Sequence, residues 1–213
     1  MKRGYATIAA IIATAIVLSS AAGSSAQAAD IIDDWANVKS PPPPALKPVT
    51  VDPKTTALLL LDFLPGVYCS GKPHCVAQLP ALKQLLAEAR ANGAMVVFSV
   101  AGDLGPGDIL KEVAPLPNEP WVKSAGDKFL NTNLEKILKD KGIQTVIVAG
   151  TAANGSALYT ASAAGLRGFK VVVPVDGLSA LDPYAEQLTV WQLANAPRLS
   201  ASVTLTRSTM IKF

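Results

Sequence analysis

The sequence predicts an α/β fold, a three-layer α/β/α sandwich around a mostly parallel, doubly wound sheet. Three observations support this prediction. Short apolar runs alternate with amphipathic stretches, several runs are apolar at nearly every position, and glycine or proline stands at many of their boundaries. A strand without a polar face is buried on both sides, as in a parallel sheet covered by helices on both faces.

The predicted strands begin with TALLLLDF at 56–63, a continuous apolar run followed by a helical pattern. The later runs have the same character, except that the last alternates between polar and apolar residues, as an edge strand does. The further predicted strands are 94–100, a short candidate PWVKS at 120–124, 144–150, 169–175 and the edge candidate 202–206.

Four stretches between these strands are predicted helices. Each has apolar or small residues at helical spacing, and glycine or asparagine marks several of their ends. They are 78–92 with Leu79, Leu82, Leu86 and Ala89 on one face, 131–142 with Leu134, Ile137 and Leu138, the small-residue stretch 154–167, and a helix from Pro183 whose Tyr184, Leu188 and Trp191 share a face.

The chain divides into three predicted parts. Residues 1–29 have Lys2 and Arg3, an apolar run and a final Ala-x-Ala pattern, which is typical of a cleaved secretory signal and predicts a periplasmic or secreted protein. The alternative is a membrane anchor, but the apolar run is shorter than the ~20 residues that a spanning helix needs. Residues 30–54 form a Pro-rich arm, and 55–213 form the domain.

The charge of the chain excludes some partners. Loss of Lys2 and Arg3 with the signal would lower the formal net charge by two, from +3 to +1. A nearly neutral mature protein gives no indication of binding to nucleic acid or to an anionic membrane surface. Neither a GxGxxG motif nor a P-loop occurs, so no cofactor is predicted.

The two cysteines, Cys69 and Cys75, are close together in the sequence. In an exported protein this spacing favours a local disulfide. The alternatives are two free thiols or a metal site that includes His74, although two cysteines and one histidine are a small ligand set for zinc. A free Cys69 would also be an alternative source of a nucleophilic thiol.

Three polar side chains follow predicted strands: Asp62, Lys123 and Ser156. Because ligands of such sheets bind beyond the carboxyl ends of the strands, we expect these residues to face one site. Taken singly, each has a structural explanation, as a turn residue, a solvated charge or a helix cap.

Three motifs together resemble those of the isochorismatase-like hydrolases, the cysteine hydrolase superfamily. They are LLLLDF, KSAGDKFLNTNL and GTAANGSALYTA, and the resemblance covers roughly residues 55–205. The resemblance implies that Asp62 is an acid/base, that Lys123 is the catalytic lysine, and that Ser156 stands where most members have the cysteine nucleophile. The backbone N–H groups of Gly155 and Ser156 would form the oxyanion site.

Further features are implied by the same resemblance. A cis peptide bond that does not involve proline is expected between Thr151 and Ala152. Phe63, Tyr68 and Trp121 are candidates for an apolar wall of the substrate site, with core packing as the alternative. A small-molecule substrate and a homo-oligomer are expected, and no metal is predicted because the segment 98–110, unlike that of the nicotinamidases, contains no histidine.

The serine at position 156 leaves two functions open. An alcohol is harder to ionise than a thiol, and a carboxylate beside an ammonium is a weak base for that task. In the first, the chain is a hydrolase of a small amide, ester or enol ether, with Ser156 as nucleophile or hydrogen-bond donor and Asp62 as acid/base. The alternative is an inactive relative that binds a small ligand.

Overall fold

A computed structural model describes residues 30–213, so the predicted signal at 1–29 lies outside the described residues. Residues up to Pro41 and residues from Pro42 onward form separate units. In the first, Asp30 Oδ1 accepts a hydrogen bond of 2.8 Å from the N–H of Ile32 within a series of turns. The second unit includes the end of the predicted arm, because β1 (Val49–Thr50) pairs with β9 (Ile211–Lys212).

The main sheet is parallel throughout, as predicted, and its strands follow the order β4-β3-β2-β5-β6-β8, with β7 paired to the end of β5. From β2 the chain adds strands in one direction and then, from β5, in the other, so the switch point lies between β2 and β5. The strands are β2 (Thr56–Leu61), β3 (Met95–Val100), β4 (Trp121–Lys123), β5 (Thr145–Thr151), β6 (Lys170–Pro174), β7 (Leu178–Ser179) and β8 (Val203–Thr206).

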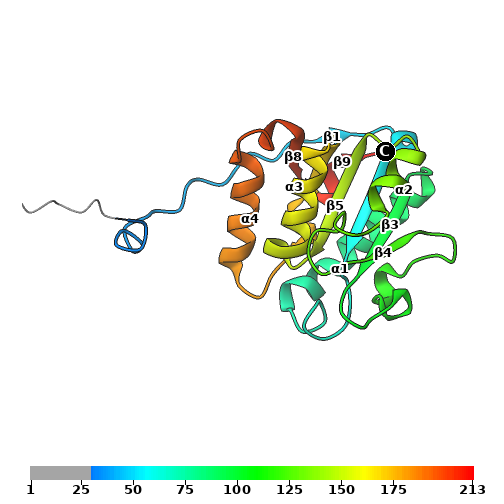
Figure 1. Cartoon of the computed structure of the whole chain (residues 1–213), viewed down its shortest axis with the longest axis horizontal. Helices are drawn as coiled ribbons and strands as arrows, with labels where there is room; N and C mark the ends of the chain where they lie inside the picture. The colour runs from blue at the N-terminus through cyan, green and yellow to red at the C-terminus, as the bar shows by residue number, and fades with distance from the viewer. Residues whose placement is uncertain (1–29) are drawn as a thin grey trace, which may run out of the picture. The chain divides into compact units, whose positions relative to one another are not determined.

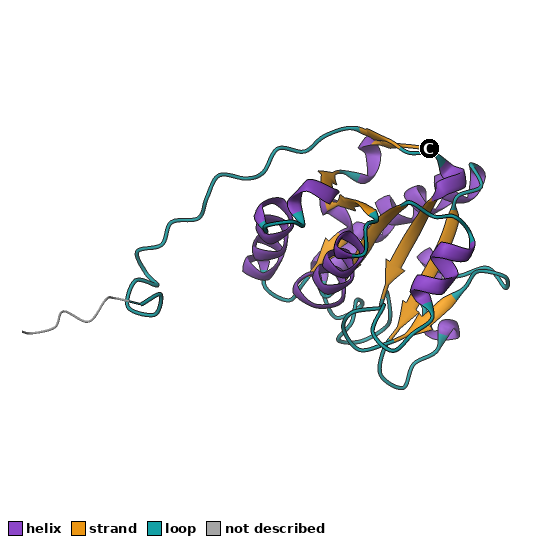
Figure 2. Ribbon diagram, turned by 45° about the horizontal axis from the view of Figure 1, so that its top comes forward, coloured by secondary structure: helices purple, strands orange, loops and turns teal. Residues whose placement is uncertain are grey.

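Helices cover both faces of this sheet, as Figure 1 and Figure 2 show. Alternate residues of the central strands face two apolar clusters, one beneath α1 and the other beneath α2, α3 and α4. The helices are α1 (Pro73–Ala91), α2 (Leu134–Asp140), α3 (Leu158–Leu166) and α4 (Pro183–Asn195). None of the helices within residues 30–213 is long and apolar enough to cross a membrane.

Short helical turns connect these elements. The turn η4 (Ala153–Ala157) is a single π-type turn between β5 and α3, and it carries Ser156. The others are 3₁₀ turns: η1 (Pro53–Thr55), η2 (Pro106–Asp108), η3 (Lys111–Val113), η5 (Val175–Gly177), η6 (Ser200–Ser202) and η7 (Ser208–Met210).

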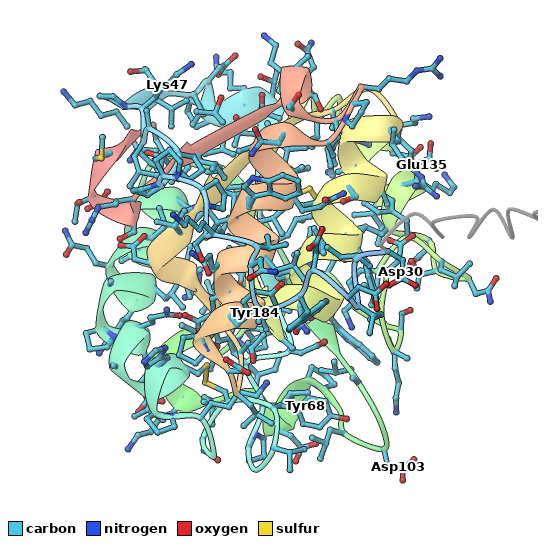
Figure 3. The ribbon with its side chains drawn as sticks, turned by 90° about the vertical axis from the view of Figure 1, so that its left-hand side faces the viewer. Asp30, Lys47, Tyr68, Asp103, Glu135 and Tyr184 are labelled. Atoms are coloured by element: carbon cyan, nitrogen blue, oxygen red, sulfur yellow. A yellow bond between two sulfur atoms is a disulfide. The ribbon has the colours of Figure 1, made fainter. Side chains whose placement is uncertain are left out.

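Two helices differ from the sequence prediction. Helix α1 begins at Pro73, several residues before the predicted start, because proline is compatible with the first helical position. The shared face of Tyr184, Leu188 and Trp191 on α4 is exposed in the chain, and the buried residues of this helix are Thr189 and Leu193. Figure 3 shows Tyr184 on this outer helix. The apolar spacing therefore predicted the helix correctly but does not mark the side that packs on the sheet.

Gly150, at the end of β5, allows the two central strands to approach closely. A Cβ atom at this position would lie 2.8 Å from Leu61 Cβ and 3.3 Å from the Leu61 carbonyl oxygen. Leu61 and Gly150 are also register partners, so the residues that follow them lie side by side: Asp62 just after β2 and Thr151 at the end of β5.

We expect Gly150→Ala to destabilise the protein by about 1–3 kcal/mol, because the added methyl group has no space between β2 and β5. The matched control is Gly107→Ala, at an exposed position with no heavy atom within 4 Å of the added carbon. This control should stay within about 0.5 kcal/mol of the wild type in urea unfolding. Equal stability of the two variants would contradict the close approach.

Candidate active site

Asp62 is the first residue after β2, and its carboxylate is buried at 2% exposure. The backbone turns sharply here, with a φ of 58°, in the left-handed region that aspartate tolerates better than most residues. Ser99, the register partner of Leu61 in β3, donates a hydrogen bond of 2.7 Å from Oγ to Asp62 Oδ1. This turn directs the carboxylate across the edge of the sheet. Residues in such strained backbone conformations are often found at functional sites.

The lysine that pairs with Asp62 is Lys128. Its Nζ lies 2.8 Å from Asp62 Oδ2, and its side chain is completely buried. The same Nζ donates a hydrogen bond of 2.6 Å to the carbonyl oxygen of Ser124, and the Lys128 N–H donates to Thr160 Oγ1 on α3. The loop after β4 and helix α3 therefore hold this ammonium group in place.

The sequence predicted Lys123 as the lysine of this site, but the lysine that pairs with Asp62 in the structure is Lys128. In β4, Trp121 and Lys123 are exposed and Val122 between them is buried, because successive side chains of a strand point to opposite faces. No salt bridge joins Lys123 to a carboxylate in residues 30–213, whereas Lys128, five residues later, reaches Asp62. The sequence signal that could have indicated an inward-turned segment is the apolar Phe129 next to Lys128, which is buried in the structure.

Ser156 is buried in η4, at the carboxyl end of β5. Its hydroxyl donates a hydrogen bond of 2.9 Å to the carbonyl oxygen of Thr151, so this proton is not directed to Asp62. The Gly155 N–H, predicted to be free for an oxyanion, donates instead to the Ala152 carbonyl oxygen at 3.1 Å. The π-type turn uses this donor internally, and the peptide bond between Thr151 and Ala152 is cis.

A second buried lysine, Lys72, was not predicted from the sequence. Its Nζ donates a hydrogen bond of 2.7 Å to Thr151 Oγ1, which in turn donates one of 2.7 Å to the carbonyl oxygen of Tyr68. Burial lowers the pKa of Lys72, while the negative charge of Asp62 acts to raise it. No motif of the sequence indicates this lysine, because its position depends on the fold of the loop that carries it.

Cys69 and Cys75 form a disulfide, as the sequence favoured, and Lys72 lies between them. The pairing rules out a free thiol at Cys69 as the nucleophile, and residues 30–213 contain no free cysteine. His74 contacts the Glu186 carboxylate at 3.2 Å from Nδ1. No group of three potential metal ligands among histidine, cysteine, aspartate and glutamate occurs in the described part of the chain.

The three aromatic candidates for the substrate site have different environments. Phe63 is buried in the apolar cluster beneath α1, which corresponds to the core-packing alternative. Tyr68 is partly buried, and a Cβ atom on Gly102 would lie 2.9 Å from its hydroxyl oxygen. Tyr68 and Asp103 lie at the same end of the domain in Figure 3. Trp121 is 44% exposed at the start of β4, away from the carboxyl end of that strand.

Comparison with known proteins places the chain in a family. The model of the Isochorismatase domain family matches residues 56–207. The chain belongs to the isochorismatase family. It is also 31% identical over 161 residues to streptothricin hydrolase from Streptomyces noursei, in an alignment that covers 69% of this chain and 61% of that protein. The chain thus spans about three fifths of the length of this relative.

Solved structures share the same fold. An isochorismatase family protein from Desulfovibrio vulgaris has a TM-score of 0.63 at 24% identity, covering 73% of this chain and 95% of the other. N-carbamoylsarcosine amidase from Thermoplasma acidophilum has a TM-score of 0.60 at 21% identity, covering 72% and 96%. At these identities the similarity establishes the parallel α/β fold, which the sequence predicted.

We expect Lys128→Met to destabilise the isochorismatase-family domain by about 3–5 kcal/mol, because it leaves the Asp62 carboxylate buried without its counterion. The control is Lys123→Met, which should change the free energy of unfolding by less than about 0.5 kcal/mol at an exposed position. Chemical denaturation of both variants measures the difference. A larger loss for Lys123→Met would reverse the assignment of the buried lysine.

Proposed function

We propose that this protein is a hydrolase of a small amide or ester, with Asp62 as acid/base, Lys128 as its charged partner and Ser156 as nucleophile. The observation that supports this proposal is the fully buried ion pair between Asp62 and Lys128 at the switch point of the sheet. Burying two charges costs more than burying a well-packed apolar pair, so such a pair at the carboxyl ends of the central strands indicates chemistry better than it explains stability.

The first half of the reaction transfers the acyl group to Ser156. The Ser156 hydroxyl turns from the Thr151 carbonyl, its oxygen bonds to the substrate carbonyl carbon, and its proton passes to the Asp62 carboxylate. The electron pair of the carbonyl double bond moves to oxygen. When this pair returns, the bond to the amine or alcohol breaks, and Asp62 returns the proton to the leaving group.

The second half releases the acid. Water gives a proton to Asp62 and bonds to the carbonyl carbon, and the bond to Ser156 Oγ then breaks as Asp62 returns the proton to this oxygen. Lys128 compensates the charge of the carboxylate whenever Asp62 is ionised. The Ser156 N–H, at the start of the helical segment, is the backbone donor that we assign to the oxyanion.

The relatives support the amide class. One is named a hydrolase of streptothricin and another an amidase of N-carbamoylsarcosine. We also propose that the protein acts outside the cytoplasm, on the basis of the signal-like pattern at 1–29 and the disulfide near the site.

We expect Asp62→Asn to lower kcat by about 10²–10⁴-fold, because it removes the group that moves the proton in both halves of the reaction. Lys128→Met should reduce kcat to a similar degree at a temperature where it remains folded, and Lys123→Met should stay within about twofold of the wild type. Product formation from a panel of amides, ureides, esters and isochorismate measures these effects. Unchanged turnover in Asp62→Asn would exclude the proposed mechanism.

A second function is favoured by the hydrogen bond from Ser156 to Thr151. A hydroxyl that donates to a backbone carbonyl is occupied in the turn, which fits a relative that binds a small ligand without turnover. In this case Ser156 stabilises the turn and does not act as a nucleophile.

Intact-mass spectrometry during turnover distinguishes the two functions. We expect an acyl adduct on the Ser156 peptide that Ser156→Ala abolishes, while Ser156→Cys retains an adduct because a thiolate forms more readily. Product without any adduct would contradict a serine nucleophile and indicate that water, activated by Asp62, attacks the substrate. Ligand binding with neither product nor adduct would establish the binding protein.

A further inference from the structure

Lys72 is turned inward from the loop between Cys69 and Cys75, although its two neighbours in the sequence face solvent. The residues on both sides of it, Gly71 and Pro73, are exposed, whereas Lys72 itself is 5% exposed. Its N–H donates a hydrogen bond of 2.8 Å to the carbonyl oxygen of Cys69. The disulfide from Cys69 to Cys75 closes this loop, so the backbone that carries Lys72 is constrained at both ends.

The ammonium group of Lys72 has no counterion of its own. Its hydrogen-bond partner is the uncharged Thr151 hydroxyl, and within residues 30–213 no carboxylate oxygen lies within 4.0 Å of Nζ. The nearby carboxylate of Asp62 is already paired with Lys128 and Ser99. Two buried lysines thus share one buried carboxylate, which gives this end of the sheet an excess of one positive charge.

Such a charge is costly when it is buried without a counterion. Desolvation penalises the ammonium form of Lys72 and lowers its pKa, and the field of Asp62 opposes this only in part. An anion that entered the site would supply the missing partner and two further hydrogen-bond acceptors for Nζ. Binding of an anion would then offset the unfavourable desolvation free energy of the Lys72 ammonium group.

The position of Lys72 connects it to the reaction site. Its partner, Thr151, is the last residue of β5 and lies beside Asp62, because Leu61 and Gly150 before them are register partners. Ser179, on β7, is the register partner of Thr151, and its hydroxyl is fully buried without a hydrogen-bond partner. An unpaired cation and an unpaired hydroxyl therefore border the same strand end.

We propose that Lys72 recognises a carboxylate on the substrate, with the Ser179 hydroxyl as a second hydrogen-bond donor to it. The substrate class is then a small amide or ester that bears a free carboxylate. This inference rests on the proposed function for the location of the site, but binding of the carboxylate does not require turnover.

Paired probes that differ in charge test the proposal. Succinamate and malonamate each carry a carboxylate, and succinamide and malonamide are their neutral counterparts; benzoate and benzamide form a third pair. We expect calorimetry on the wild type to show at least one pair in which the carboxylate binds about tenfold or more tightly than its counterpart, as a charged hydrogen bond predicts.

Lys72→Met should remove this preference. It should weaken carboxylate binding by about tenfold or more and leave the neutral counterpart within about twofold, and where succinamate is hydrolysed it should raise KM with little change in kcat. The control is Lys83→Met, at an exposed position on α1, the helix that follows Lys72, and it should behave as the wild type. Equal weakening of both members of a pair would show a structural role and overturn the proposal.

The two proposals fail separately. A carboxylate preference without turnover would support the recognition site and contradict the proposed hydrolase. Hydrolysis of the neutral amides, with no carboxylate preference in any pair, would leave the hydrolase and remove the recognition site. If Lys72→Met does not fold, binding of the paired probes to the wild type is measured at low and high salt. Salt should weaken binding of the carboxylate but not of its neutral counterpart, since a charged contact is screened and a neutral one is not.

Discussion

The buried ion pair between Asp62 and Lys128 is the constraint on which the rest of the site depends. Its distance of 2.8 Å connects the end of β2 to the loop after β4, two segments that the sheet places on either side of β3. Ser99 on β3 binds the same carboxylate, and Thr160 on α3 holds the backbone of Lys128. A buried ion pair is stable only when the remaining hydrogen bonds of its charged groups are made, so the pair depends on these neighbours.

Thr151 joins this pair to the second lysine and to Ser156. Its hydroxyl binds Lys72 and Tyr68, and its carbonyl oxygen accepts the hydrogen bond of Ser156. One residue at the end of β5 therefore contacts both the disulfide-closed loop and the turn that carries the hydroxyl. A change in the loop that moved Lys72 would act on Ser156 through this single residue, without contact between the two side chains.

Most of the fold could be predicted from the sequence, because β2, β3, β5 and β6 are buried on both faces and their apolar runs show it directly. The site was predictable only in part. Motif spacing located the segment of the chain that supplies the lysine paired with Asp62, but it does not determine which side chain turns inward. Lys123 is exposed in β4, and Lys128 is the buried partner of Asp62. Lys72 had no signal at all, since its ammonium group binds Thr151 of β5, which is far away in the sequence. The apolar face of α4 shows the same limit, because spacing does not distinguish a face on the sheet from an exposed one.

The replacement of a thiol by a hydroxyl at position 156 has a chemical consequence beyond nucleophilicity. A thiol is a weak hydrogen-bond donor and would compete poorly for the Thr151 carbonyl, whereas a hydroxyl binds it well, as the distance of 2.9 Å shows. The serine is therefore more firmly held in the turn than a cysteine would be, and this hydrogen bond has to break before Ser156 can attack. The charge arrangement around it does not depend on that event. An excess positive charge beside Asp62 favours an anionic ligand whether or not the hydroxyl reacts, so ligand charge is the more direct consequence of this structure and catalysis the one that needs a further step.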